Sequence, residues 1–216
     1  MIAFEHVTKD YHVKGVHKRI LEDASYQFAE GKNIALMGHN GVGKSTMMRM
    51  IAGIEAPTSG AVKCTEKVSW PMGFSKGFNG LMTGVENVRF VARVYGCDTE
   101  QVLAQVQEFA ELGPSLDLPI ETYSSGMKAR LAFGLSLAIR FECYLVDEIT
   151  AVGDQRFRKK SEHALRERIE ASRVVMISHS ERTIREFCDE GVLAYGGKLY
   201  HYDDLNALIA DYKRFC

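Results

Sequence analysis

The sequence predicts an α/β fold, and three observations support this. An apolar stretch at residues 33–37 precedes a glycine-rich loop and then apolar residues at helical spacing, an order typical of strand, loop and helix. Short apolar runs at 143–146 and 173–177 are typical of buried parallel strands. Helical periodicity dominates residues 83–138. We therefore expect an α/β core with a helical insert at about 83–138.

The remaining elements follow from local patterns. Residues 2–7 and 24–29 alternate as strands do around a polar turn centred on Lys14 and Gly15, which predicts an antiparallel hairpin. Further expected elements are a turn at 57–60, short strands near 62 and at 68–70, helices over 88–95, 102–112 and 127–138, a hairpin of 192–195 with 199–202, and a helix over 203–213. Together they predict one domain over residues 1–216.

Composition excludes several classes of function. The net charge of −1 gives no electrostatic reason to expect a nucleic acid partner. The five cysteines are scattered, odd in number and without metal-ligand spacing, which favours free thiols in a reducing compartment. The longest apolar run, residues 131–139, is far shorter than the ~20 residues that cross a bilayer. We expect no membrane span.

The glycine-rich loop carries the clearest chemistry. Residues 38–46 match G-x-x-x-x-G-K-[ST], a phosphate-binding loop whose backbone N–H groups point at phosphate oxygens. Lys44 can reach the β- and γ-phosphates, and the Ser45 hydroxyl can bind Mg²⁺. The loop therefore predicts binding of a nucleoside triphosphate with Mg²⁺. Its expected nucleotide-binding residues are Gly38, Asn40, Gly41, Gly43, Lys44, Ser45 and Thr46.

Two acids and a histidine lie at the ends of the later apolar runs. Asp147 ends the first run, where it can hold Mg²⁺ directly or through water. Glu148 follows it and can act as the general base that polarises the attacking water. His179 follows the second run and can contact the γ-phosphate, although a core histidine is the alternative reading.

A second candidate anion site opens the third predicted helix. Ser124, Ser125 and Gly126 are small residues at the start of that helix, where free N–H groups and the helix dipole favour an anion. Taken alone, this pattern is explained as well by an ordinary helix cap.

In this order, the motifs resemble those of the ATP-binding subunits of ABC transporters over nearly the whole chain. The resemblance implies a P-loop NTPase (RecA-like) core with an antiparallel β subdomain and an α-helical subdomain. It implies that Tyr11 stacks on adenine, that Ser124 to Gly126 form the signature motif, and that Asp154 helps couple two subunits. It assigns three catalytic residues: Glu148 as the catalytic glutamate, His179 as the switch histidine, and Lys44.

Two departures narrow the resemblance. Ser125 and Met127 replace the first glycine and the glutamine of the signature, and this variant resembles the exporters of capsular polysaccharide. No glutamine matches the family's Q-loop; Asn79 occupies the equivalent place, one methylene shorter. In place of the family's direct contact, we therefore expect a water molecule to bridge Asn79 and Mg²⁺.

The resemblance also implies partners and a location. Two copies would bind ATP head to tail, and the homodimer would dock on membrane-spanning permease subunits. The loop of residues 71–84 offers Phe74 and Phe78 as anchors, and core packing beneath the loop is the alternative interpretation of either one. Periplasmic and outer-membrane export components would be indirect partners. The expected location is the cytoplasmic face of the bacterial inner membrane, as a peripheral subunit. The alternatives are an exporter of O-antigen or teichoic acid and, with less support, a soluble ABC ATPase outside transport.

Overall fold

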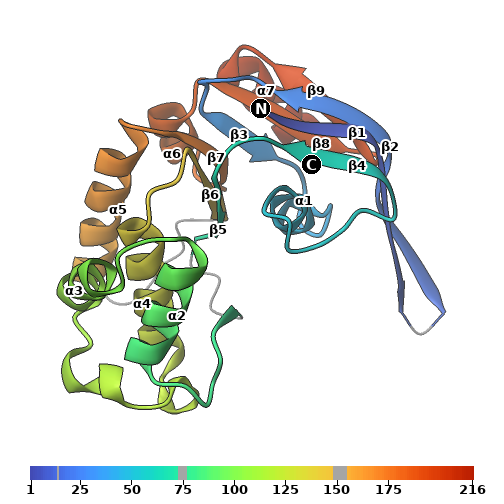
Figure 1. Cartoon of the computed structure of the whole chain (residues 1–216). Helices are drawn as coiled ribbons and strands as arrows, with labels where there is room; N and C mark the ends of the chain where they lie inside the picture. The colour runs from blue at the N-terminus through green and yellow to red at the C-terminus, as the bar shows by residue number, and fades with distance from the viewer. Residues whose placement is uncertain (14, 73–76, 148–154) are drawn as a thin grey trace. The chain divides into compact units, whose positions relative to one another are not determined.

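The computed structural model describes residues 1–13, 15–72, 77–147 and 155–216 (Figure 1). Lys14, Phe74, Glu148 and Asp154, which the sequence analysis singled out, lie outside the described residues. The chain divides into two units, which we describe separately. The first comprises Met1–Pro71, Glu142–Glu148 and Ser172–Cys216, and the second comprises Met72–Phe141 and Ile149–Ala171.

A six-stranded sheet forms the centre of the first unit. Its order is β5 (Val68–Pro71), β6 (Cys143–Asp147), β7 (Arg173–Ile177), β3 (Ile34–Met37), β8 (Glu190–Tyr195) and β9 (Lys198–Tyr202). All neighbours are parallel except β8 and β9, which form the predicted hairpin. Every residue of β3 and β7 is buried, as expected for strands covered on both faces. The predicted parallel core is confirmed.

A three-stranded antiparallel sheet, of order β2-β1-β4, completes the β structure of this unit. Its strands are β1 (Ile2–Val13), β2 (Val16–Phe28) and β4 (Ser59–Cys64). The predicted hairpin is confirmed, but both of its strands are longer than expected. The register shifts near His6 and Asp23, which have φ of 50° and 43°. These bulges interrupt the period-two alternation by which the strands were recognised.

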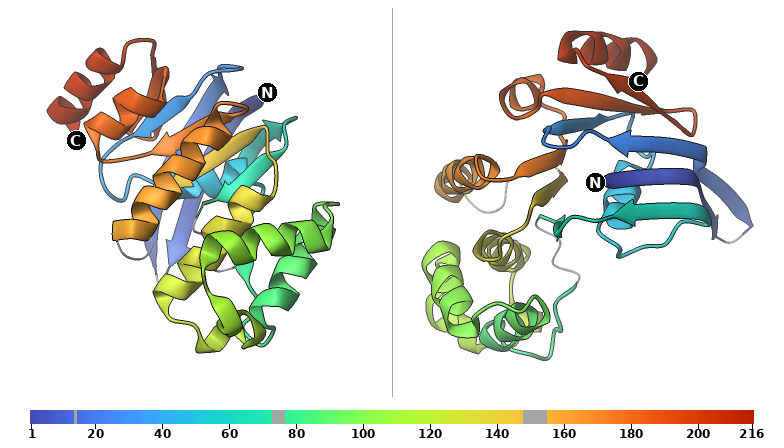
Figure 2. Two further views of the ribbon diagram at one scale, coloured as in Figure 1. Left: turned by 90° about the vertical axis from the view of Figure 1, so that its left-hand side faces the viewer. Right: turned by 45° about the horizontal axis from the view of Figure 1, so that its top comes forward.

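Three helices pack on these sheets. Helix α1 (Lys44–Ile51) lies on one face of the six-stranded sheet and α6 (Glu181–Phe187) on the other (Figures 1 and 2). Helix α7 (Leu205–Phe215) covers β8 and β9. Met47, Met48 and Ile51 of α1 are buried in one cluster with side chains of both sheets. This packing holds the loop before α1 against the core. Helix α6 was not predicted from the sequence.

The second unit is helical. It contains α2 (Gly84–Val94), α3 (Thr99–Ala110), α4 (Ser125–Ala138) and α5 (Gln155–Ile169), with short 3-10 turns at Gly113–Asp117 and Ile120–Thr122. Thr83 and Glu86 form a capping box that begins α2, and Asp98 caps α3. Helix α5 was not predicted. Its apolar positions, Phe157, Leu165 and Ile169, are sparse in an otherwise polar helix, which left the periodicity weak.

The sequence predicts no membrane-spanning helix and free cysteine thiols, and the described residues bear on both predictions. No helix among them combines the length and apolar character that a bilayer span requires. The five cysteines are free, as predicted. Burial raises the pKa of Cys143 and of Cys188 to about 12, so both remain protonated at neutral pH.

Candidate functional site

A cavity of about 470 Å³ opens in the first unit where its parallel strands end. The loop after β3, the end of β6 and the segment after β7 meet there because the carboxyl ends of parallel strands share one edge of a sheet. Thirteen residues line the cavity: Tyr11, Lys18, Ile20, Asn40, Gly41, Gly43, Lys44, Ser45, Thr46, Arg49, Asp147, Ile177 and His179. Nine of them are residues that the sequence analysis had selected.

Gly43 shows why the loop requires glycine. Its φ of 109° lies in the left-handed region, and a Cβ built there would stand 2.1 Å from the Ile20 side chain. Gly43 also occupies the N-cap of α1, where its carbonyl accepts a hydrogen bond from the Met47 N–H. No side chain caps this helix among the described residues, and its first turn carries no acid. Its N-terminal N–H groups therefore face the cavity ready for an anion.

Lys44 supplies a buried cation to the loop. Its side chain folds back so that Nζ donates to the carbonyl oxygens of Gly38, at 2.5 Å, and His39, at 3.1 Å. The residue is only 9% exposed. An ammonium group held among carbonyl oxygens in a poorly solvated loop attracts a phosphate strongly.

Oxygen ligands for a divalent cation also border the cavity. The Ser45 hydroxyl and the partly buried Asp147 carboxylate both line it, and hard oxygen ligands of this kind suit Mg²⁺. His179 lies at the same edge, with its Nδ1 3.5 Å from the Tyr212 hydroxyl. These residues fit a Mg²⁺-bound triphosphate.

Four further residues line the cavity and were not predicted as site residues: Lys18, Ile20, Arg49 and Ile177. Lys18 pairs directly with Tyr11 across the β1–β2 hairpin. Pairing the two predicted strands outward from the turn at Gly15 would have placed Lys18 opposite Tyr11. Arg49 lies one turn along α1 from Ser45, which is the usual spacing of residues on one helix face.

Gly38 does not line the cavity, but its carbonyl oxygen accepts a hydrogen bond from Lys44 Nζ. The remaining predicted site residues belong to the second unit or lie outside the described residues. Ser124 is the N-cap of α4, and its Oγ accepts a hydrogen bond from the Met127 N–H at 3.2 Å. Ser124 and Ser125 are exposed. The Asn79 Oδ1 accepts from the Leu81 N–H at 3.0 Å, so this side chain stabilises the turn before α2. None of Ser124, Ser125 and Asn79 is among the residues that line the cavity of Lys44.

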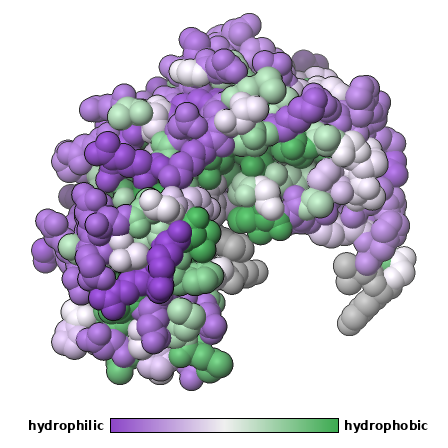
Figure 3. All heavy atoms as spheres, viewed as in Figure 1, coloured by the Kyte–Doolittle hydropathy of each residue, from purple (hydrophilic) through white to green (hydrophobic). Residues whose placement is uncertain are grey.

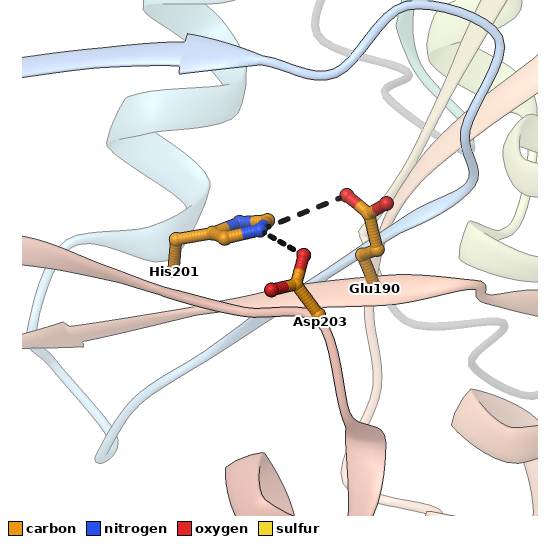
Figure 4. Close-up of side chains that lie close together, drawn as sticks. All are labelled: Glu190, His201 and Asp203. Carbon is orange, nitrogen blue, oxygen red and sulfur yellow. Dashed lines mark hydrogen bonds and ion pairs between the residues drawn. The ribbon is translucent and has the colours of Figure 1, made fainter.

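A second group of metal-type ligands gathers elsewhere in the first unit (Figure 4). His201 Nε2 lies 2.8 Å from Asp203 Oδ1 and 3.9 Å from Glu190 Oε2. Glu190 pairs with Ile34 at the start of β3, so the group lies at the opposite end of the strands from the glycine-rich loop. The Tyr26 hydroxyl contacts His201 Nδ1 at 2.9 Å, and Asp203 is 89% exposed. These contacts make a surface ion-pair cluster, and we assign no metal to it.

Comparison with known proteins identifies the family. The sequence model described as "ABC transporter" matches residues 21–151. This chain belongs to the ABC transporter family. It is the ATP-hydrolysing subunit, as expected from the motifs.

Individual relatives match over most of their length. The chain is 46% identical to the polysialic acid transport ATP-binding protein KpsT of Escherichia coli, over 99% of both chains. It is 44% identical to the capsule polysaccharide export ATP-binding protein CtrD of Neisseria meningitidis, over 95% of both. Among solved structures, the ATP-binding cassette MJ0796 bound to ADP and Pi aligns with a TM-score of 0.76 at 21% identity, covering 95% of this chain and 99% of that one. The predicted fold class is confirmed.

Proposed function

We propose that this ABC subunit hydrolyses ATP to drive export of capsular polysaccharide across the inner membrane. The observation that carries the proposal is the single cavity that joins Lys44, Ser45, Asp147 and His179 beside Tyr11. The cargo is inferred from the relatives KpsT and CtrD, whose names concern polysialic acid and capsule polysaccharide.

The predicted site residues have separate proposed roles in hydrolysis. Lys44 and the N–H groups of α1 hold the β- and γ-phosphates, and the Tyr11 ring stacks on the base. Ser45 and Asp147 hold Mg²⁺, which would neutralise charge that develops on the phosphates. Glu148 takes the proton of the attacking water, and His179 contacts the γ-phosphate. Asn79 would reach the metal through a water molecule.

A second copy would complete the site. The exposed hydroxyls of Ser124 and Ser125, with the N-terminus of α4, offer hydrogen-bond donors to phosphate. In the proposed homodimer, Ser124 to Gly126 of one copy cover the ATP held by the other, and Asp154 links the two sites. ATP closes the dimer, and hydrolysis lets it open.

Membrane-spanning permease subunits are the proposed partners, and they would hold the chain at the cytoplasmic face of the inner membrane. Apolar surface is visible among the helices of the second unit (Figure 3). The exposed large apolar side chains of this unit include Leu81, Phe90, Val94 and Leu118. Phe78 is half-buried and lies just before Leu81, so it can contribute to a docking surface.

Deletion of the gene from its host tests the proposed cargo. We expect loss of surface capsule and accumulation of polymer inside the cell, with rescue by the wild type but not by Lys44→Ala. Loss of O-antigen or teichoic acid with intact capsule would instead support the related exporters. Normal amounts of all three polymers, together with ATPase activity in the purified chain, would support an ABC ATPase outside transport.

A further inference from the structure

Beside the nucleotide cavity, Glu55 is surrounded by three hydrogen-bond donors. Its Oε1 accepts from the Tyr11 hydroxyl, through a short hydrogen bond, and from Lys9 Nζ at 2.7 Å. Its Oε2 accepts from Arg49 Nε at 2.9 Å. Neither Glu55 nor Arg49 belongs to the glycine-rich loop, yet Arg49 and Tyr11 both line the cavity. Glu55 therefore connects two cavity-lining residues, Tyr11 and Arg49, without lining the cavity itself.

The Tyr11 ring is held from more than one side. Its hydroxyl lies 3.3 Å from both Arg49 Nη2 and Thr46 Oγ1. Lys9 Nζ stands 4.9 Å from the centre of its ring. Lys9 is itself fixed, because Nζ also donates to the carbonyl oxygen of Ala56 at 2.8 Å. With its hydroxyl and one face engaged, the ring has little freedom to rotate.

Electrostatics keep Glu55 charged. Burial alone would raise its pKa, but hydrogen bonds from Lys9, Tyr11 and Arg49 outweigh burial and lower the pKa to about 2. The side chains of Glu55 and Lys9 are 20% and 11% exposed, so solvent screens their interaction less than at an open surface. Charge-assisted hydrogen bonds of this kind are the stronger ones in proteins.

Arg49 connects this group to the phosphate end of the cavity. Its Nη2 donates to Thr46 Oγ1 at 3.0 Å, and Thr46 follows Lys44 and Ser45 in the first turn of α1. We propose that Glu55 is a positioning residue, which with Arg49 fixes the Tyr11 ring where the base of the nucleotide binds. This inference rests on the proposed stacking of Tyr11 on the base. Glu55 then sets the affinity for base and sugar and leaves the hydrolytic step unchanged.

Steady-state kinetics of purified variants test this. Glu55→Gln keeps the size of the side chain but removes its charge, and Tyr11→Phe keeps the ring but removes the hydroxyl. Each should raise the KM for ATP by about twofold to tenfold, the range for losing one aromatic stacking contact, with kcat unchanged. Inhibition by magnesium tripolyphosphate, which lacks base and sugar, should be unaltered. The double variant should show no further rise in KM.

The control is Glu5→Gln, because Glu5 forms an exposed ion pair with Lys63, at 2.7 Å, on the same antiparallel sheet. Its KM should equal that of the wild type. A fall in kcat, or weaker tripolyphosphate inhibition, in Glu55→Gln would overturn the inference by indicating a general effect on the loop. If Glu55→Gln does not fold, Tyr11→Phe alone decides, and an unchanged KM there overturns it.

Tyr11→Ala separates this inference from the proposed function. If the KM rises in Tyr11→Ala but is unchanged in Glu55→Gln and Tyr11→Phe, the positioning role of Glu55 is contradicted and the stacking of Tyr11 on the base is supported. An unchanged KM in Tyr11→Ala would show that the ring does not stack on the base, and both proposals about Tyr11 would fail.

Discussion

Lys44 Nζ lies 2.5 Å from the carbonyl oxygen of Gly38, the residue that begins the glycine-rich loop. The side chain of Lys44, at the start of α1, thus reaches back to the first residue of the loop. Lys44 is buried and lines the cavity, so solvent screens its charge little there. This contact orders the side chain before a phosphate arrives.

Lys44→Ala should reduce ATP hydrolysis by at least about a hundredfold, because the phosphates lose their main counter-charge. Phosphate release measures the rate, and circular dichroism checks the fold. Lys32→Ala is a suitable control, because Lys32 lies at the opposite end of the strands from the loop, where its Nζ is 3.9 Å from Glu190 Oε1. This variant also removes a lysine charge, but away from the cavity. Normal hydrolysis by a folded Lys44→Ala protein would contradict the assignment of the loop.

Glu148→Gln should preserve ATP binding and slow hydrolysis strongly, because the amide cannot accept the proton of the attacking water. Dimers should accumulate in Mg²⁺-ATP, and size-exclusion chromatography with light scattering would detect them. A variant that hydrolyses ATP at the normal rate would exclude Glu148 as the base.

Ser124→Arg should block hydrolysis while each copy still binds ATP, because the bulky cation disturbs the site that α4 offers to the partner. Mixed with Lys44→Ala, it should recover part of the activity, since one of the two shared sites in a mixed dimer is intact. Absence of recovery, with mixed dimers demonstrated by pull-down, would argue against the head-to-tail arrangement.

Gly43→Ala should weaken nucleotide binding and destabilise the fold by roughly 1–3 kcal/mol, because an alanine at φ 109° is strained and its Cβ meets Ile20. Gly53→Ala is the matched control. Gly53 also has positive φ, 68°, but nothing lies within 4 Å of the Cβ position. Urea denaturation and ATP titration separate the two variants; equal loss in both would show that crowding by Ile20 is unimportant.

Glu66→Gln should destabilise the fold by roughly 1–3 kcal/mol at pH 7, because it removes the charged partner of the buried Arg173, 2.8 Å away. Burial raises the pKa of Glu66, but hydrogen bonds from Arg173 and the N-terminus outweigh it and lower the pKa below the usual 4.5. The stabilisation is therefore complete above pH 4.5 and is lost as pH falls through the lowered pKa. Urea denaturation at pH 7 and at pH 3 should show the difference between wild type and variant shrinking; a constant difference would contradict the ion-pair account.

Local patterns predicted most elements of the fold, and the exceptions have physical causes. The buried strands β3, β6 and β7 were recognisable because each is a short apolar run. Helix α5 was missed because few of its residues are apolar, and its stability comes from tertiary contacts such as the Phe109–Phe157 ring pair.

By itself, the sequence determined that a phosphate-binding loop follows one buried strand, that two acids lie at the end of a second buried strand, and that a histidine follows a third. Each of these features is a pattern of residues that are adjacent in the chain, so it can be recognised without the tertiary structure. Only the tertiary structure decided that β3 lies between β7 and β8, and that Lys18 and Arg49 join Tyr11 at the cavity. The hydrogen bonds of Glu55 to Tyr11 and Lys9 span more than forty residues. Strand order and such contacts depend on long-range packing, for which one sequence carries no local signal.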